Sequence, residues 1–357
     1  MRMRTVIIGA SGNVGTALLR NLSNRGDPGI VVGVCRRPPP ARPPYDIATW
    51  HAIDVADANA AQQLSAVLRP DDVVINLVWG FQPTRNVRRL ERVGVGGLQA
   101  VVDAAGRVGA RQLLHMSSVG TYRRAPGQRV SENWPTDGVP TSAYSRHKAA
   151  AERLLDGMEG TANGPIVTRF RPGIIVQRGA GSALLRYGLP GYVPAPLIRL
   201  LPVLPLDRRL TIPLVHADDV ATAVLSAIER EAGGAFNLAA EPAISRDDIA
   251  AALHAHPIHV PQSLVRGLVA ATFAARVQRI DAGWIDLAFA APLLDTTRAR
   301  SELGWEPRVD ARAALAEAID GMKAAGSTSS PVLRPRTVGR QFRELLQSGP
   351  ITSRTLS

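Results

Sequence analysis

Two side chains that could move a proton stand four residues apart, at Tyr144 and Lys148. Because four residues is just over one helical turn, a helix continuing to Leu155 would place both on one face. An ammonium beside a phenol favours the phenolate and lowers the pKa of the phenol, which suits proton transfer near neutrality. Ser118 ends an apolar segment that begins near Gln112, and ligands bind where parallel strands end. We therefore predict that Ser118 meets Tyr144 in a ligand site.

A glycine-rich turn near the N-terminus predicts a nucleotide-binding loop. A short β-branched strand leads into Gly9, Gly12 and Gly15, and a helix predicted over 13–24 follows. Gly9 allows a tight turn, Gly12 lets the backbone approach a pyrophosphate, and Gly15 lets the helix pack close to the sheet. The N-terminal N–H groups and positive dipole end of that helix would face the phosphates. Because a second strand comes next, at 30–35, the context favours nucleotide binding over a simple turn.

The elements that must position these groups alternate along the chain. Apolar segments predict strands at 5–9, 30–35, 50–54, 72–78, 111–117 and 166–171, with helices between them. This alternation predicts an α/β fold built on a doubly wound parallel sheet. Helical periodicity runs over 86–107, where three glycines imply close helix packing. A return strand is expected at 236–238, and Ser245 is expected to cap a helix over 244–255.

The predicted organisation has a nucleotide-binding domain, a smaller lobe and a tail. Residues 1–172 form the nucleotide-binding domain, to which 212–240 return. The Pro- and Gly-rich sequence that follows marks the departure into a substrate-binding lobe, made of 173–211 and 241–325. Residues 326–357 hold five arginines among Ser, Thr and Pro, and this composition predicts a basic, flexible tail.

Composition limits the partners and the compartment. The net charge is +12, but the positive charge is spread along the chain and is almost all arginine, with only two lysines. No helix-turn-helix signature or aromatic-interleaved basic stripe accompanies it, so we expect no nucleic-acid partner. The single cysteine, Cys35, excludes an internal disulfide, and no signal peptide is evident, which together predict a cytoplasmic protein. Prolines and Arg199 interrupt the apolar stretch from Leu189 to Leu206, which makes it a poor membrane span.

The ordered set of motifs resembles that of the extended short-chain dehydrogenases/reductases, of the NAD(P)-dependent epimerase/dehydratase type. The glycine turn, Ser118 and Tyr144-x-x-x-Lys148 carry the resemblance, which covers about residues 4–322. Further matches are Asp54-Val55-Ala56-Asp57, Arg171-Pro172-Gly173, Val215-His216-Ala217-Asp218-Asp219-Val220 and Leu303-Gly304-Trp305-Glu306-Pro307. The resemblance implies a Rossmann fold with a smaller C-terminal substrate lobe, and an NAD(P)-dependent oxidoreductase.

The resemblance also implies a role for each site residue. Tyr144 would be the acid/base at a substrate oxygen, Lys148 would hold the nicotinamide ribose and bias the Tyr144 pKa, and Ser118 would polarise the substrate oxygen. Ser118 is preferred to Ser117 because it stands four residues before Tyr122, as the family's serine does. Asp54 and Val55 would contact the adenine. Further cofactor contacts are implied at Gly9, Ser11, Gly12, Asn13, Val14, Gly15, Leu77 and Pro172. Hydride chemistry would belong to the nicotinamide.

The end of the second strand bears on the choice of cofactor. An acidic residue there accepts from the 2′-hydroxyl of NAD, whereas arginine accommodates the 2′-phosphate of NADP. This chain has Cys35-Arg36-Arg37 and no carboxylate. We therefore favour NADP(H), with Arg36 and Arg37 at the phosphate. NAD(H) stays open, because both arginines could simply face solvent.

Four departures from the family pattern narrow the function. Trp79 stands where relatives keep small residues, so it either reshapes the pocket floor or packs in the core. Gly94 replaces a common helix asparagine, which argues against an asparagine-assisted proton relay. Pro172 and Ile212 replace the asparagine and arginine that nucleotide-sugar epimerases often carry. These two differences favour a smaller or more apolar small-molecule substrate.

Two other functions remain open on the sequence. One is an epimerase or dehydratase that acts on a sugar or nucleotide sugar with tightly held NAD. The other is a non-catalytic NADP-binding sensor or assembly protein, which would not depend on Tyr144. The family often forms homodimers, so a homodimer is an expectation on that ground alone.

Several other residues invite a chemical role, but the sequence favours a structural one for each. The spacing of His254, His256 and His259 fits neither a helical pair nor a zinc knuckle, so no metal is expected. Asp218 and Asp219 form a carboxylate pair in a region that, in the resembling family, supports architecture. His216 is expected to be a hydrogen-bonded structural residue, and Cys35 a small buried one.

Overall fold

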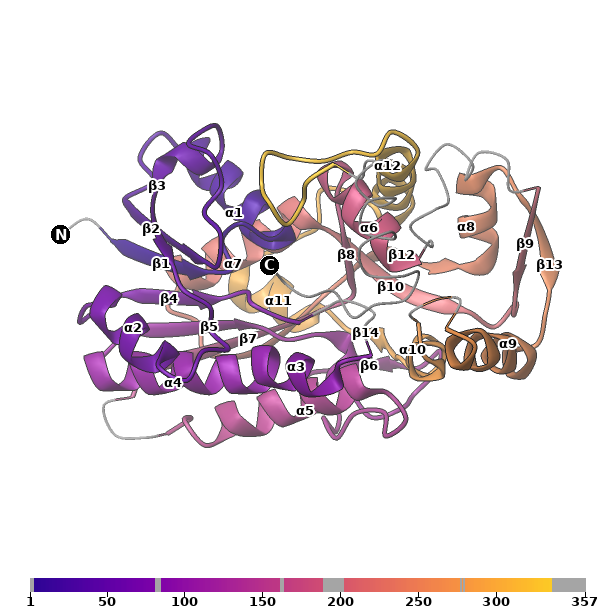
Figure 1. The fold of residues 1–357 in the computed structure, drawn as a ribbon, viewed down its shortest axis with the longest axis horizontal. Coiled ribbons are helices and arrows are strands. Elements are labelled where there is room, and N and C mark those ends of the chain that lie inside the picture. The colour runs from indigo at the N-terminus through magenta and orange to yellow at the C-terminus, as the bar shows by residue number, and fades with distance from the viewer. Residues whose placement is uncertain are drawn as a thin grey trace.

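A parallel sheet of seven strands forms the centre of the protein (Figure 1). The computed structural model describes residues 3–80, 85–160, 164–188, 202–276, 278 and 280–335. In spatial order the strands are β11 (Gly234–Leu238), β7 (Ile166–Pro172), β5 (Gln112–Met116), β4 (Val73–Asn76), β1 (Arg4–Ile8), β2 (Ile30–Cys35) and β3 (Ala48–Ala52), and each neighbouring pair is parallel. The predicted doubly wound parallel sheet is confirmed. Because β1 lies between β2 and β4, the sheet has its switch point there, and ligands bind beyond the carboxyl ends of strands at such a point.

Helices cover both faces of this sheet (Figure 1). One layer contains α1 (Asn13–Ser23) and α7 (Ala217–Glu229), and the other contains α2 (Ala60–Val67), α4 (Gly97–Val108) and α5 (Ala143–Asp156). Successive side chains of a strand point to opposite faces, so β1 contributes to both cores. Ile7 packs with α1 and α7, whereas Val6 and Ile8 pack with α2, α4 and α5. The apolar strands are therefore buried on both sides, as their near-continuous hydrophobic sequence predicts.

Two predicted elements differ from the structure. Strand β3 begins at Ala48, two residues before the predicted start, because its register pairs Ala48 with Val31 of β2. The helix predicted over 86–107 is divided into α3 (Val87–Glu91), a π-helical turn (Arg92–Gly96) and α4. A β-carbon at Gly97 would lie 2.6 Å from the Val55 side chain, so the expected close packing is present at Gly97, whereas nothing approaches Gly96 within 4 Å.

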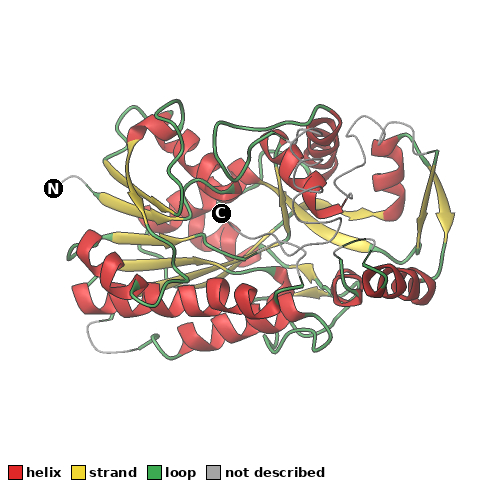
Figure 2. Cartoon of the chain, viewed as in Figure 1, coloured by secondary structure: helices red, strands yellow, loops and turns green. Residues whose placement is uncertain are grey.

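Smaller sheets extend from the carboxyl edge of the main sheet (Figure 2). A three-stranded sheet contains β8 (Ile174–Val176), β10 (Thr211–His216) and β12 (Ala240–Ser245); β9 (Val203–Leu206) pairs with β13 (His256–His259), and β6 (Arg129–Val130) with β14 (Leu293–Leu294). Around them lie α6 (Gly181–Gly188), α8 (Arg246–Leu253), α9 (Gln262–Ala274), α10 (Ala282–Ala288) and α12 (Ala311–Lys323). Helix α11 (Thr297–Leu303) packs instead against β11 and α7 of the main sheet. Ser245 caps α8 as predicted, in a capping box with Asp248, although Ile244 belongs to β12.

The segment after α12 packs against the body of the protein. Ser330 and Leu333 are buried, and the Ser330 hydroxyl donates to the carbonyl of Ser11 in the glycine turn, 2.6 Å away. Thr328 and Tyr45 share a hydrogen bond of 2.8 Å. The flexible tail predicted over 326–357 is therefore wrong for residues 326–335, because these long-range hydrogen bonds hold them. The remainder of that tail lies outside the described residues.

In the part of the chain that the structure describes, no helix combines the length and the apolar character that crossing a bilayer would require.

Candidate functional site

The first turn of α5 and the end of β5 bring Tyr144 and Ser118 together. Ser142 caps α5, which places Tyr144 in its first turn. Ser118 follows β5, and its hydroxyl accepts the Gly120 N–H at 3.0 Å while also hydrogen-bonding the Tyr144 phenol. A β-carbon at Gly120 would lie 3.0 Å from the Tyr144 ring, so the missing side chain allows this approach. The serine and the tyrosine that the sequence analysis paired are in contact.

Lys148 lies one turn further along α5 and is almost completely buried, with 2% of its surface exposed. Its ammonium donates to the carbonyl oxygen of Met116 at 2.7 Å and stands 3.6 Å from the centre of the Trp79 ring. Burial disfavours the charged form and lowers the Lys148 pKa to about 7, although the nearby Glu152 carboxylate acts in the opposite direction. Lys148 therefore changes charge in the physiological range.

The pKa of Tyr144 is raised, not lowered as the sequence analysis expected. Burial disfavours the phenolate and raises the Tyr144 pKa to about 12, and the hydrogen bond from Ser118 offsets this only in part. Burial and the Ser118 hydrogen bond account for the shift, and the Lys148 ammonium is not among its causes. Tyr144 is consequently protonated at pH 7.

Two tryptophans flank the Tyr144 ring. Trp79, just after β4, meets it edge to face, with centroids 6.2 Å apart and planes at 82°. Trp284 from α10 lies closer, with centroids 5.1 Å apart and planes at 34°. Trp284 could not be predicted as a site residue, because nothing in the local sequence of α10 links it to α5. The Tyr144 ring is thus in contact with two aromatic side chains from different elements.

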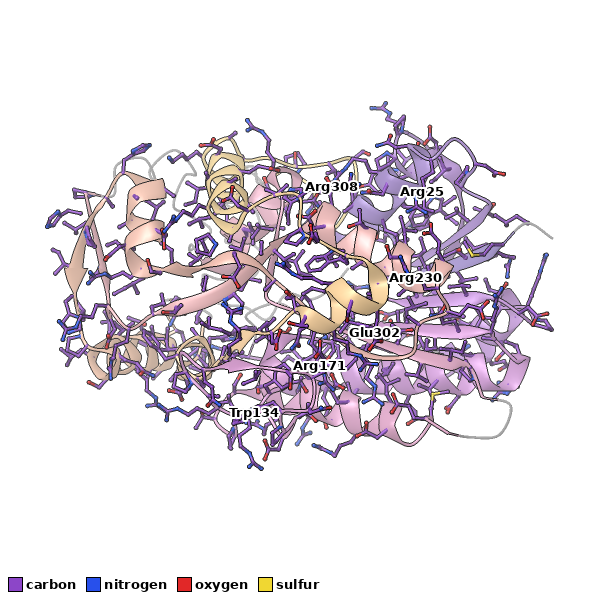
Figure 3. All side chains as sticks on the ribbon, turned by 180° about the vertical axis from the view of Figure 1, so that it is seen from behind. Arg25, Trp134, Arg171, Arg230, Glu302 and Arg308 are labelled. Atoms are coloured by element: carbon purple, nitrogen blue, oxygen red, sulfur yellow. The ribbon has the colours of Figure 1, made fainter. Side chains whose placement is uncertain are left out.

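A buried ionic cluster supports the site from beneath. Glu152 is fully buried and accepts two hydrogen bonds from Arg171, each 2.9 Å long, and one of 3.1 Å from Arg169. Arg171 is labelled in Figure 3, in the view from behind. The Ser117 hydroxyl donates to Glu152 at 2.5 Å, so Ser117 is committed to this cluster and Ser118 is the serine at Tyr144. Burial alone would raise the Glu152 pKa, but the hydrogen bonds and charge of Arg171 hold it at about 2.

The glycine turn has the geometry of an anion-binding cradle. Gly9 has a φ of +89°, and a β-carbon at Gly15 would lie 2.4 Å from the carbonyl oxygen of Ala10, so neither position accepts a side chain. Gly12 is the N-cap of α1 and provides no side-chain cap. No N-cap side chain therefore accepts a hydrogen bond from the first N–H groups of α1, which lie at the switch point of the sheet. These residues fit a dinucleotide, because a pyrophosphate could accept from the first turn of α1.

The other predicted cofactor contacts lie around this turn. Ser11 is 2% exposed beneath Ser330 and hydrogen-bonds Cys35, so it offers backbone rather than side chain. The Asn13 side chain joins α1 to β8 by donating to Ile175 and accepting from Gln177.

Three more of the predicted contacts are part of the sheet or its helix. Val14 is buried in the core under α1. The N–H of Leu77 donates to Ile8 at 2.8 Å, which continues the pairing of β4 with β1. Pro172 is buried at the end of β7. All three lie at or near the carboxyl edge of the sheet.

An arginine cluster surrounds Asp54 beyond the ends of β2 and β3. Arg36 lies 4.0 Å from the Asp54 carboxylate, and Arg89 from α3 lies 3.6 Å from it. Burial lowers the pKa of Arg36, as do the charges of Arg37 and Arg89, while Asp54 raises it. Val55, the other predicted adenine contact, is buried against α4. Arg89 was missed in the sequence analysis because its position at Asp54 depends on how α3 packs.

The remaining candidates are structural. The Asp219 carboxylate accepts the backbone N–H groups of Arg308 and Val309, and the Asp219 carbonyl accepts from Trp305. His216 caps α7, as its imidazole accepts the Asp218 N–H. Figure 3 shows the position of Arg308.

Cys35 and the three histidines near β13 were the other residues with a potential chemical role. Cys35 is buried, and burial raises the pKa of its thiol. His259 accepts the Arg208 N–H at 3.3 Å. Within the described ranges, no three His, Cys, Asp or Glu side chains are grouped as a metal site would need.

Comparison with known proteins gives the family and the fold. None of the curated proteins compared with the chain matches it. Among solved structures, MoeE5 in complex with UDP-glucuronic acid and NAD is 21% identical, with a TM-score of 0.66 over 90% of this chain and 99% of that chain. UDP-glucose 4-epimerase from Thermotoga maritima with UDP-glucose is 16% identical, with a TM-score of 0.68 over 90% and 99%. Human epimerase family protein SDR39U1 (isoform 2) with NADPH is 19% identical, with a TM-score of 0.65 over 89% and 99%.

At these identities the structural likeness shows a shared fold. The model of the NAD dependent epimerase/dehydratase family matches residues 5–239, which is most of the chain and includes the glycine turn, Ser118, Tyr144 and Lys148. The chain therefore belongs to the NAD dependent epimerase/dehydratase family.

Proposed function

We propose that this protein is a nicotinamide-dependent oxidoreductase that interconverts a carbonyl and an alcohol on a small, non-nucleotide molecule, with NADP(H) preferred. The contact between Ser118 and Tyr144, with Lys148 one turn further along α5, carries the proposal. When bound, a nicotinamide supplies the hydride. The fitting geometry of the glycine turn supports a dinucleotide at this edge of the sheet.

Tyr144 is the proton donor in this proposal. Reduction of a carbonyl requires one hydride at carbon and one proton at oxygen. A phenol with a pKa of about 12 carries its proton at neutral pH and can donate it as negative charge develops on the oxygen. Ser118 donates a second hydrogen bond to that oxygen, and Lys148 binds the ribose hydroxyls with its ammonium. The protonated state of Tyr144 favours reduction over oxidation near neutrality.

The walls of the site support a substrate with an apolar body. Tyr144 and Trp284 pack with Val139, Leu287 and Ala290, all of them apolar. Aromatic walls of this kind favour planar or hydrocarbon groups over hydrated sugars. We propose that 173–211 and 241–325 make the substrate lobe, in which Trp284 lies.

A second candidate is an NAD-dependent epimerase acting on a nucleotide sugar. The family description and the solved structures with UDP-sugars and NAD favour it. The residues at 172 and 212 argue against it, because Pro172 and Ile212 cannot supply the amide and guanidinium donors that a diphosphate would accept.

The test is deuteride transfer from [4-²H]NADPH to a panel of aldehydes and ketones with apolar bodies. We expect a deuterated alcohol from the native protein. Tyr144→Phe should lower turnover by about 10²–10⁴-fold and leave NADPH binding unchanged. Tyr45→Phe is the matched control for loss of a tyrosine hydroxyl, because this hydroxyl hydrogen-bonds Thr16 and Thr328 and not Ser118. We expect it to retain turnover. Undiminished turnover in Tyr144→Phe would contradict the proposal. In a parallel assay with NAD and a UDP-sugar, inversion of a sugar carbon without net formation of NADH would favour the epimerase.

A further inference from the structure

The ammonium of Lys148 is a charge that the fold holds almost entirely out of water. Such a charge is unfavourable unless its surroundings compensate for lost hydration. Two contacts of the ammonium itself are defined, the carbonyl oxygen of Met116 at 2.7 Å and the face of the Trp79 ring at 3.6 Å. A cation over an indole face is attracted by the ring quadrupole, and the attraction grows when the pair is desolvated. Trp79 is therefore placed to stabilise the charged form of Lys148.

The ring of Trp79 is itself held in place by its surroundings. A β-carbon at Gly94 would lie 3.1 Å from two carbons of the indole, so this ring occupies the space that a side chain at 94 would need. Gly94 is buried in the π-helical turn Arg92–Gly96. On another side the ring meets His115 edge to face at 6.2 Å, and the His115 imidazole is fixed by Asn76 at 3.2 Å.

We propose that Trp79 is the positioning residue of Lys148: its ring face holds the ammonium, and the absence of a side chain at Gly94 leaves room for the ring. A catalytic effect of Trp79 rests on the proposed function, whereas the contact between the Lys148 ammonium and the Trp79 ring does not depend on it. The sequence left two interpretations of Trp79 open, a residue of the pocket floor or a residue of the core. In this proposal both hold, because the ring packs in the core and also contacts Lys148 and Tyr144.

The charged and titratable groups around Lys148 give the direction of the effect. Glu152 and Tyr144 lie on the same helix, and His115 faces it from β5. Burial lowers the His115 pKa to about 3, so His115 is neutral at pH 7, as is Tyr144. Glu152 is the carboxylate that raises the Lys148 pKa, and it stays ionised throughout the neutral range. These neighbouring groups keep their charge states when Trp79 is replaced. Loss of the cation–π attraction to its ring should then lower the pKa of Lys148 by about one unit.

The chain allows a direct test, because Lys148 and Lys323 are its only lysines. Full-length protein labelled with [¹³Cε]lysine gives two resonances, and Lys323→Arg identifies the one from Lys148. Titration from pH 5 to 9 then measures the Lys148 pKa, and the ring current of Trp79 marks the resonance through an upfield shift. In Trp79→Leu we expect the upfield shift to vanish and the pKa to fall. Trp79→Phe keeps an aromatic face and should restore part of both.

Gly94→Ala gives a second, milder perturbation that keeps the indole. The added methyl must move the Trp79 ring by a few tenths of an ångström, so the Lys148 resonance should shift in the native background and not in Trp79→Leu. A Lys148 pKa and resonance that are the same in native protein, Trp79→Leu and Gly94→Ala would overturn the proposal. Equal effects of Trp79→Leu and Trp79→Phe would overturn it as well, since bulk alone would then explain them. The titration needs neither nucleotide nor substrate, so failure of the proposed function, seen as absent NADPH binding, is a separate result.

Discussion

Replacing Arg36 with alanine should weaken NADPH binding and leave NADH binding unchanged. Arg36 directly follows β2, and its guanidinium lies 4.0 Å from the Asp54 carboxylate. A 2′-phosphate is the one group that separates the two nucleotides, and a guanidinium can bind it with two hydrogen bonds. The selectivity therefore depends on whether Arg36 faces that phosphate or merely balances Asp54.

The expected magnitude follows from exposure and competition. Hydrogen bonds to charged groups contribute about 1.5–3 kcal/mol. The Arg36 side chain is 37% exposed and already attracts Asp54, so the lower limit applies. About 1.5 kcal/mol corresponds to roughly a tenfold weaker affinity for NADPH. Arg37→Ala and Arg89→Ala should each have a similar or smaller effect, and because the three arginines are neighbours their effects should not add.

Fluorescence titration with NADPH and NADH measures both affinities. Arg25→Ala is the matched control, because Arg25 is exposed, pairs with Glu229 and follows the far end of α1 (Figure 3). The NADPH preference of the native protein should shrink as salt rises, since exposed charges are screened. Equal loss of NADPH and NADH affinity in Arg36→Ala, or no loss of either, would refute the placement of the phosphate at this cluster.

Three further predictions concern the support of the site. Glu152→Gln leaves Arg169 and Arg171 buried without their shared carboxylate, so urea unfolding should show a loss of about 3–5 kcal/mol, and a loss below 1 kcal/mol would contradict the cluster's role. The pKa of Glu152 in the folded protein is about 2, below its ordinary 4.5, so its stabilisation is present above pH 4.5 and is lost as pH falls toward 2. In that window the slope of unfolding free energy against pH should be smaller in Glu152→Gln than in the native protein. An unchanged slope would refute this. Ser330→Ala should lower the unfolding free energy by about 1 kcal/mol, since the Ser11 carbonyl loses a buried donor, and an unchanged Tm would show that the segment does not support the turn.

The main sheet could be predicted from the sequence because local patterns specify it. The β-branched strand, the three glycines and the apolar helix of β1–α1 each favour the same structure, and the Ser245 cap depends on residues only three apart. Tyr144 and Lys148 are paired by helical spacing alone. Features of this kind need no knowledge of the tertiary structure.

The features that could not be predicted depend on residues distant in the chain. The raised pKa of Tyr144 follows from burial beside Trp284, which is 140 residues away. Ser330 meets Ser11 across more than 300 residues, so composition alone suggested a free tail. The approach of Gly94 to the Trp79 ring and the contact of Arg89 with Asp54 both join residues that lie far apart in the sequence. In each case a tertiary contact outweighs the local sequence preference.

The most direct test of the account is whether the purified protein binds a nicotinamide dinucleotide at the glycine turn. Fluorescence titration of the native chain with NADPH and NADH should show binding of both, with NADPH tighter. Gly12→Val should weaken both, because a side chain there projects beside the Gly9 carbonyl at the entrance to α1. If neither nucleotide binds, or if Gly12→Val binds both as tightly as the native protein, the assignment of this edge of the sheet as a dinucleotide site is contradicted.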